Sequence, residues 1–382
     1  MGHTSDFFQS KKAWSILKDE ILDYYLTPYI SKILYTGKPL IIIDCFAGKG
    51  RFDDGERGSP LIIARHIEKI RADIKKRNRD ISGIFIEKKY YKELEQNLLA
   101  AHNCRILSGA FEEHINSILD IDRSTNIFVY IDPYGVKCLD FSRFSRIKSK
   151  GFYTLEMLLN FNSVGFLREG CRLLICDNLK DEDDGDDYEI DEANNTANMD
   201  RIANGNYWRE LVEAMRNNDL SMLEAEQIFM KRYTEQIQSL FAYVVNIPIK
   251  QKTKNIPKYR LIFGTNNQEG LLLMADNMHK KWQKILESQR GGQMVLFDDY
   301  EMPDLSVVPE STLEEDIVEN LKNAGGSMLL KELIVKLILK YGVTFSESYY
   351  KKKIKEMPLR LTELGNPISS TDYKNHKILV SL

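Results

Sequence analysis

The sequence lacks most of the features that would assign it to a class at once. Only five of its 382 residues are cysteine and no two form a C-x-x-C pair, so a zinc ribbon, an iron–sulfur cluster and a disulfide framework have no support. No apolar run approaches the roughly 18–20 residues that span a bilayer, and the first residues lack a signal-peptide core. We therefore expect a cytoplasmic protein with reduced thiols, no membrane contact and no metal site.

A strong excess of one charge is also lacking. The chain has 53 Lys+Arg and 56 Asp+Glu, a formal net charge of -3. However, nine of the twelve residues at 181–192 are acidic, and the rest of the chain carries +6 without them. Like charges repel, so we expect this acidic insert to form an exposed loop on a mildly basic body. The near-neutral total is therefore compatible with a phosphate-bearing partner.

The order of predicted elements indicates an α/β protein. Short apolar runs alternate with helical patterns after residue 39, which predicts a parallel sheet with helices on both faces. Two last strands, at 241–249 and 259–265, predict a terminal antiparallel hairpin. We predict N-terminal helices at 1–38, broken at Pro28 and packed on the core, a Rossmann-like domain at 39–297, a linker at 298–311 and a domain at 312–382. Three helices followed by a hairpin make this last domain winged-helix-like.

A glycine-rich loop follows the first predicted strand, in the segment IIIDCFAGKGRF. Asp53 stands where a dinucleotide fingerprint needs its third glycine, and the G-K-[ST] of a phosphate-binding P-loop is absent. An acidic residue before the glycines suits a ligand with a cationic end, such as the ammonium of S-adenosylmethionine (AdoMet). We therefore predict that AdoMet is bound by Asp44, Phe46, Ala47, Gly48 and Gly50.

Two further strand ends complete the predicted cofactor site. Glu87 ends the second strand, where a carboxylate can accept both ribose hydroxyls. Gly109 and Ala110 follow the third strand and are expected to line the adenine pocket. The alternative for Glu87 is a solvated residue at a strand end.

The motif IFVYIDPYG at the end of the fourth strand is the candidate for the chemistry. Asp132 can accept a hydrogen bond from an amino group, Pro133 shapes the turn, and Tyr134 can stack on a planar acceptor such as a flipped base. The motif resembles the D-P-P-Y signature of enzymes that methylate amino groups of nucleic acids, with the aromatic residue one position earlier. We count Asp132 with the cofactor site as well. The alternative is a plain turn begun by Asp-Pro.

The chain resembles the three-Cys-motif partner protein family, a bacterial group of class I methyltransferase-like proteins. The segments that carry this resemblance are KKAWSILKDEILDYYLTPY, IIIDCFAGKGRFDDGERGSPL, VYIDPYGVK, LLNFN and YRLIFGTNN. The resemblance implies a Rossmann-like AdoMet-binding domain and a partner protein with a three-cysteine motif. It implies no substrate.

Clusters of basic residues favour a nucleic-acid partner. One cluster contains Lys250, Lys252, Lys254, Lys258 and Arg260, and another contains Lys351, Lys352 and Lys353. Each cluster has a plain alternative, a solvated polar face.

Our leading hypothesis is an AdoMet-dependent methyltransferase that acts on an amino group of DNA or RNA. The rival is a non-catalytic, methyltransferase-like adaptor that binds nucleic acid and acts with a three-Cys-motif partner. An NAD-dependent oxidoreductase is disfavoured by Asp53.

Overall fold

The structure is a computed structural model that describes residues 11, 13–73, 79–174, 195–250, 256–290, 310–364 and 377–382. The chain divides into two compact units, Met1–Asn266 and Asn267–Leu382. The acidic insert at 181–192 and most of the predicted linker at 298–311 lie outside the described residues. None of the described helices has the length and apolar character needed to cross a membrane.

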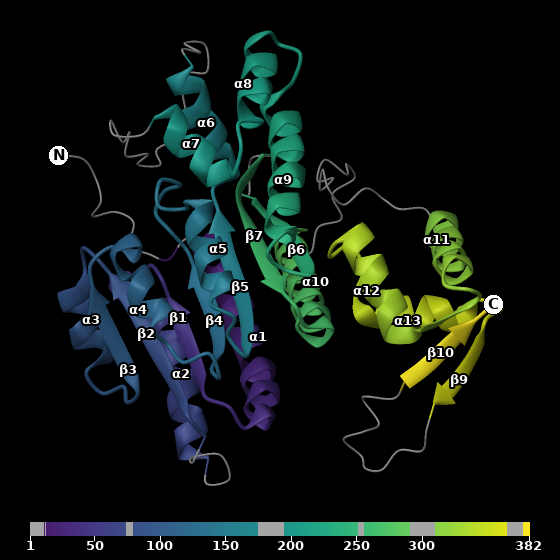
Figure 1. Ribbon diagram of the computed structural model, residues 1–382, viewed down its shortest axis with the longest axis horizontal. Coiled ribbons are helices and arrows are strands. Elements are labelled where there is room, and N and C mark those ends of the chain that lie inside the picture. The colour runs from purple at the N-terminus through teal and green to yellow at the C-terminus, as the bar shows by residue number, and fades with distance from the viewer. Residues whose placement is uncertain are drawn as a thin grey trace. The chain divides into compact units, whose positions relative to one another are not determined.

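The first unit is built on a seven-stranded sheet (Figure 1). Its strands are β1 (Leu40–Asp44), β2 (Ile81–Glu87), β3 (Cys104–Ser108), β4 (Asn126–Ile131), β5 (Thr154–Phe161), β6 (Tyr243–Lys250) and β7 (Pro257–Thr265). They are ordered β3-β2-β1-β4-β5-β7-β6, with β7 antiparallel to both of its neighbours and the other pairs parallel. The predicted α/β class is confirmed, as a methyltransferase-like sheet with a terminal antiparallel hairpin.

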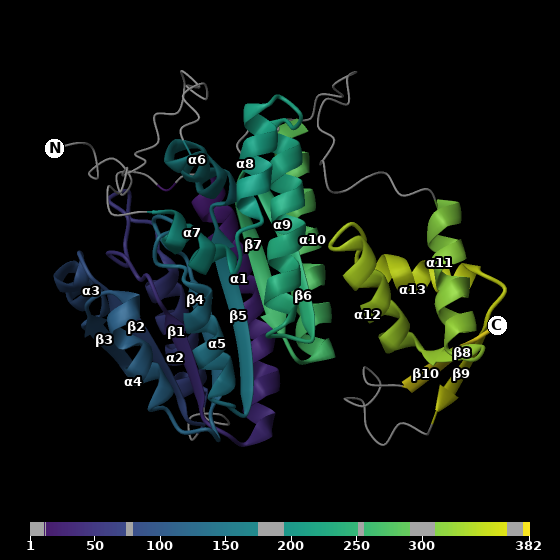
Figure 2. The same ribbon diagram turned by 45° about the horizontal axis from the view of Figure 1, so that its top comes forward.

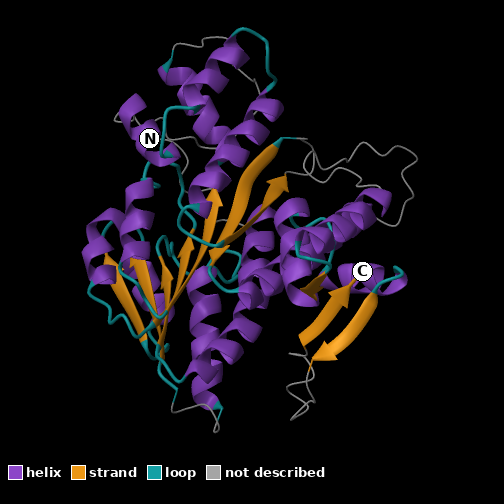
Figure 3. Ribbon diagram, turned by 45° about the vertical axis from the view of Figure 1, so that its right-hand side comes forward, coloured by secondary structure: helices purple, strands orange, loops and turns teal. Residues whose placement is uncertain are grey.

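Helices cover both faces of this sheet (Figure 3). They are α1 (Ala13–Ile33), α2 (Ser59–Ala72), α3 (Tyr91–Leu98), α4 (Ile115–Leu119), α5 (Phe141–Ser149), α6 (Ser163–Leu173), α7 (Thr196–Ala203), α8 (Trp208–Arg216) and α9 (Met222–Gln238), with short 3-10 turns at Leu34–Thr36 and Phe111–His114. One large apolar cluster joins the strands to residues of α4 to α9. Helix α1 packs on the sheet through Tyr25, whose ring lies 5.8 Å from that of Phe128 and 5.3 Å from that of Phe263.

Helix α1 runs through Pro28, so the predicted break at this residue is wrong. Proline removes one backbone N–H and crowds the preceding turn. Here the flanking turn is held by packing, because Tyr25 and Tyr29 stack with ring centroids 5.4 Å apart and both side chains are buried. Tertiary contacts of α1 thus outweigh the tendency of proline to interrupt a helix.

The second unit contains α10 (Gln268–Arg290), α11 (Glu310–Asn323), α12 (Leu330–Tyr341) and α13 (Glu347–Glu356) (Figure 2). The strands β8 (Ser327–Leu329), β9 (Arg360–Leu364) and β10 (Lys377–Ser381) form an antiparallel sheet in the order β8-β10-β9. The sequence predicted three helices and a hairpin here but not β8. It also placed α10 with the first domain, whereas in the structure His279 Nδ1 of α10 lies 2.9 Å from the Val343 carbonyl oxygen of the second unit.

Candidate active site

The carboxyl ends of neighbouring parallel strands bring the two predicted motifs together. Strands β1 and β4 are paired with Asp44 opposite Tyr130, so the loops that follow them start side by side. One pocket at this edge is lined by predicted residues from both loops: Phe46, Ala47, Gly48, Gly50, Asp132, Pro133 and Tyr134. Helix α1 and strand β7 complete its wall with Lys18, Asp19 and Tyr259. The sequence did not single out these three.

Two glycines shape the loop after β1. Gly48 has a φ of 62° and Gly50 a φ of 83°, in the left-handed region that favours glycine. A side chain at Gly50 would also place its Cβ 3.0 Å from Leu94 Cδ1. The loop therefore needs glycine at these positions, and its backbone is open to a ligand in the pocket.

Asp44 is fully buried behind this loop. Its Oδ1 accepts a hydrogen bond of 3.2 Å from the Phe46 N–H. Its Oδ2 has no partner with hydrogen-bond geometry among the described residues. Burial raises the pKa of Asp44 to about 7, although contacts with Ser59 and Phe46 act against this. Asp44 does not itself line the pocket, but it lies directly beneath the glycine loop, and a buried oxygen without a donor there is compatible with a hydrogen bond from the ammonium of AdoMet.

Glu87 holds the glycine loop from the end of β2. Its Oε2 accepts from the Gly48 N–H at 2.7 Å, and its Oε1 accepts from the N–H groups of Lys89 at 2.8 Å and Tyr90 at 2.9 Å. A carboxylate offers about four lone-pair positions. One position therefore stays open to a ribose hydroxyl, which is compatible with the predicted role.

Gly109 and Ala110 lie next to Glu87 rather than in the pocket wall. Strand β3 pairs with β2 so that Ser108 faces Glu87, and the Gly109 N–H donates to the Glu87 carbonyl at 3.1 Å. Gly109 has a φ of 139°, a backbone conformation that residues with a side chain rarely adopt, so this position favours glycine. The loop stands at the same edge of the sheet as the glycine loop.

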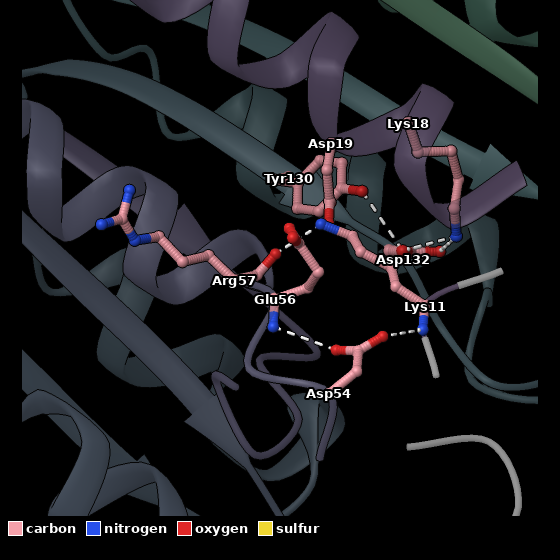
Figure 4. A network of polar contacts seen from close by, with 8 residues as sticks. All are labelled: Lys11, Lys18, Asp19, Asp54, Glu56, Arg57, Tyr130 and Asp132. Carbon is pink, nitrogen blue, oxygen red and sulfur yellow. Dashed lines mark hydrogen bonds and ion pairs between the residues drawn. The ribbon is translucent and has the colours of Figure 1, made fainter. Parts of the chain in front are cut away.

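Asp132 is held by four hydrogen bonds (Figure 4 shows two of its partners, Lys18 and Tyr130). Lys18 Nζ lies 2.7 Å from both carboxylate oxygens. Asn160 Nδ2 donates to Oδ1 at 2.7 Å, and the Tyr130 hydroxyl donates to Oδ2 at 3.2 Å. The predicted catalytic carboxylate is thus already paired with a cation from α1.

Lys11 ties the start of α1 to the loop after the glycines (Figure 4). Its Nζ lies 2.7 Å from Asp19 Oδ2 and donates to the Arg57 carbonyl at 2.5 Å, while its backbone N–H donates to Asp54 at 2.8 Å. Burial raises the pKa of Asp19 to about 6, and the positive charge of Lys11 acts against this rise. The N-terminal helix is therefore part of the site.

Two tyrosines give the pocket an aromatic wall. Tyr134 is 63% exposed in the loop that follows β4, and Tyr259 lines the pocket from β7. Lys18 Nζ lies 5.1 Å from the centroid of the Tyr259 ring, and Lys258 Nζ lies 5.6 Å from it. These distances are within the range of cation–π attraction.

The basic residues of the first predicted cluster do not form one surface patch among the described residues. Lys258 lies beside Tyr259, Lys250 ends β6, and Lys252 and Lys254 fall outside the described residues. Arg260 does not belong to a surface cluster. It is 3% exposed and donates to Glu226 at 2.8 and 2.6 Å, because α9 covers this part of β7.

Three of the four lysines of α13 have acidic partners. Lys351 pairs with Glu347, and Lys352 Nζ lies 3.8 Å from Glu356. Lys353 pairs with Glu314 of α11 at 2.7 Å, and its side chain is only 11% exposed. Part of the positive charge counted in the sequence is therefore neutralised within the unit.

In the part of the chain that the structure describes, no group of His, Cys, Asp or Glu is arranged to hold a metal ion.

Comparisons with known proteins give only distant similarity. No family model matches the chain, and no curated protein matches it. Solved structures that resemble it include a Legionella pneumophila protein at 10% identity, covering 72% of this chain and 92% of that one with a TM-score of 0.39. The Streptomyces achromogenes O-methyltransferase TomG in complex with SAM (AdoMet) has 11% identity. The match covers 68% of this chain and 82% of that one, with a TM-score of 0.34.

A third match is the mycolic acid cyclopropane synthase CmaA1 complexed with SAH and CTAB, at 12% identity. The match covers 67% of this chain and 98% of that one, with a TM-score of 0.26. Likeness this low assigns no activity to the chain. The class I methyltransferase-like fold is read from the strand order itself.

Proposed function

We propose that the chain is an AdoMet-dependent methyltransferase that acts on an amino group of a nucleic acid. The observation that carries this proposal is the shared pocket of the glycine loop and the Asp132–Tyr134 motif. Methyl transfer is an in-line displacement, so donor and acceptor must lie in one cavity. The glycine loop of the predicted cofactor half and the Asp132–Tyr134 motif line this pocket, whereas Asp44 and Glu87 lie behind the loop and outside the lining. The resemblance of the chain to the three-Cys-motif partner family also supports an AdoMet-binding site.

The cofactor half would hold AdoMet through four features. Asp44, beneath the loop, would accept from its ammonium, and Gly48 and Gly50 would let the backbone approach. Glu87 would accept a ribose hydroxyl at its remaining lone pair. Gly109 and Ala110 would lie beside the adenine. When bound, AdoMet supplies a methyl group on a positively charged sulfur.

The acceptor half would orient the nucleophile. The amino group of a base is a weak nucleophile, because its lone pair is delocalised into the ring. An acceptor such as Asp132 takes a hydrogen bond from an amino N–H and turns the nitrogen lone pair toward the methyl group. Pro133 and the exposed Tyr134 ring offer a surface for stacking a flipped base.

A nucleic-acid partner is supported by charge and by the second unit. Lys258 places a cation beside the pocket wall. The order of α11, β8, α12, α13, β9 and β10 suits a winged helix, in which α13 with Lys351 and Lys352 would face the phosphates. Lys353 would contribute less, because it is buried against Glu314.

One observation favours a second candidate function. All four lone-pair positions of Asp132 are taken by Lys18, Asn160 and Tyr130, as expected of a structural carboxylate. The chain would then be a non-catalytic adaptor for nucleic acid and a three-Cys-motif partner protein. It would bind nucleic acid equally well with and without AdoMet.

A labelled-methyl assay separates these candidates. The pure protein is incubated with labelled AdoMet and with total DNA or RNA from cells that lack it, beside the variants D132A and D219A. Asp219 is an exposed acid of the same unit and serves as the matched control. We expect label in DNA or RNA, at least about 100-fold less with D132A and the wild-type amount with D219A. No label with the wild-type protein would overturn the proposal.

A further inference from the structure

We propose that Lys18 is a positioning residue of the acceptor site. Lys18 fixes the Asp132 carboxylate through two hydrogen bonds. It gives up one of them when the acceptor binds, so that the target amino group can donate to Asp132 in its place. This inference rests on the proposed function and names a residue that the glycine loop and the D-P-Y motif do not contain. Helix α1 thus contributes a positioning residue to the site.

The contacts of Asp132 show why a donor must yield. An ionised carboxylate has about four lone-pair positions. Lys18 donates to both oxygens at 2.7 Å, Asn160 donates to Oδ1 at 2.7 Å and Tyr130 donates to Oδ2 at 3.2 Å. An amino N–H can therefore be accepted only in exchange for one of these bonds.

Lys18 is the donor best able to leave. Tyr130 and Asn160 are 0% and 1% exposed, stand on the strands β4 and β5 and do not line the pocket, whereas Lys18, although only 5% exposed, does line it. The side chains of Tyr130 and Asn160 have little room to turn. Lys18 reaches the carboxylate from α1 on a flexible four-carbon stem with three rotatable N–H donors. Its ammonium lies 5.1 Å from the centroid of the Tyr259 ring, which keeps the cation in the pocket after one bond is released.

The exchange conserves charge. One Lys18–Asp132 hydrogen bond breaks and one bond from the amino N–H to Asp132 forms, and no proton is transferred between Lys18 and Asp132. The remaining Lys18–Asp132 bond, with those of Asn160 and Tyr130, holds the carboxylate while the nucleophile is oriented. Lys18 therefore competes with the acceptor for binding and also supports the reaction.

This double role gives a kinetic signature. In K18M the competing donor is gone, so the KM for the acceptor should fall about threefold or more. Asp132 also loses two of the four bonds that fix it, so kcat should fall about tenfold or more. A purely structural loss would lower kcat through a smaller active fraction and would not lower KM. K18R keeps the charge and has a rigid two-pronged donor, so it should keep kcat within about threefold and raise the acceptor KM about threefold.

The experiment is steady-state kinetics with labelled AdoMet and total nucleic acid from cells lacking the protein. The wild-type protein, K18M, K18R and K32M are compared, with AdoMet titration and thermal unfolding to check each fold. Lys32 is exposed near the other end of α1, so K32M is the matched control and should behave as the wild type.

Equal KM and kcat in K18M and wild type would overturn the inference alone. If K18M does not fold, an unchanged acceptor KM in K18R would overturn it. An inactive wild-type protein would instead overturn the proposed function and this inference with it.

Discussion

The ammonium of Lys18 lies 2.7 Å from both carboxylate oxygens of Asp132, although 114 residues separate the two in the chain. This ion pair joins the N-terminal helix to the end of the fourth strand, beside the glycine loop. The site is thus built from three places: the carboxyl edge of the parallel strands, helix α1 and strand β7. The expected effects of altering it follow from these contacts.

Asp44 should govern cofactor affinity. The variant D44N leaves the shape of the site unchanged but removes the negative charge that would meet the ammonium of AdoMet. Hydrogen bonds to charged groups contribute about 1.5–3 kcal/mol, so the Kd for AdoMet should rise about 10- to 100-fold. Calorimetric titration measures this, with D219N as the control for a lost surface charge. Equal affinities of D44N and the wild type would remove Asp44 from the cofactor site.

Tyr134 should govern acceptor binding rather than cofactor binding. Stacking of a base on an aromatic ring is worth about 1–3 kcal/mol, so Y134A should raise the acceptor KM about tenfold or more, and Y134F should keep it. The half-exposed Tyr153 lies before β5, outside the pocket lining, and Y153A serves as the control. The prediction fails if Y134A and Y153A have the same KM, or if Y134A weakens AdoMet binding instead.

Glu156 should make the stability of the first unit depend on pH. Its carboxylate is buried and accepts from Tyr25 at 2.5 Å and Thr265 at 3.0 Å, and burial raises its pKa from 4.5 to about 7. Because the pKa is higher in the folded state, the unfolded state loses its proton first as pH rises. The stabilisation is therefore complete below about pH 4.5 and is lost up to about pH 7.

The variant E156Q stays neutral and should not show this loss. Its free energy of unfolding relative to wild type should increase by about 2 kcal/mol between pH 5.5 and pH 8.5. Urea unfolding at the two pH values measures the change. An identical difference at both values would show that Glu156 does not titrate in this range.

The sequence predicted the sheet and the two loops of the site for a clear physical reason. Strands such as Leu40–Asp44 and Asn126–Ile131 are continuous apolar runs, as expected of parallel strands covered on both faces. Once those strands are parallel neighbours, the residues that follow them must meet at one edge. Asp44, Gly48 and Asp132 could therefore be grouped without knowing any tertiary contact.

Lys18 and Arg260 show where that reasoning ends. Lys18 stands four residues before Leu22 and seven before Tyr25, so it occupies a position of the buried stripe of α1. A lysine in such a stripe is a signal for a buried partner, but the partner's identity depends on how α1 crosses the sheet. Arg260 was grouped with neighbouring lysines by charge alone. Its burial against Glu226 depends on the packing of α9, which lies far away in the sequence.

The most direct test of the central claim is a mass-spectrometric comparison of nucleosides from cells with and without this protein. The account predicts one nucleoside methylated on an exocyclic amino group, present in DNA or RNA only when the wild-type protein is expressed. The D132A variant should not restore it, and D219A should. Identical nucleoside profiles in cells with and without the protein would contradict the account.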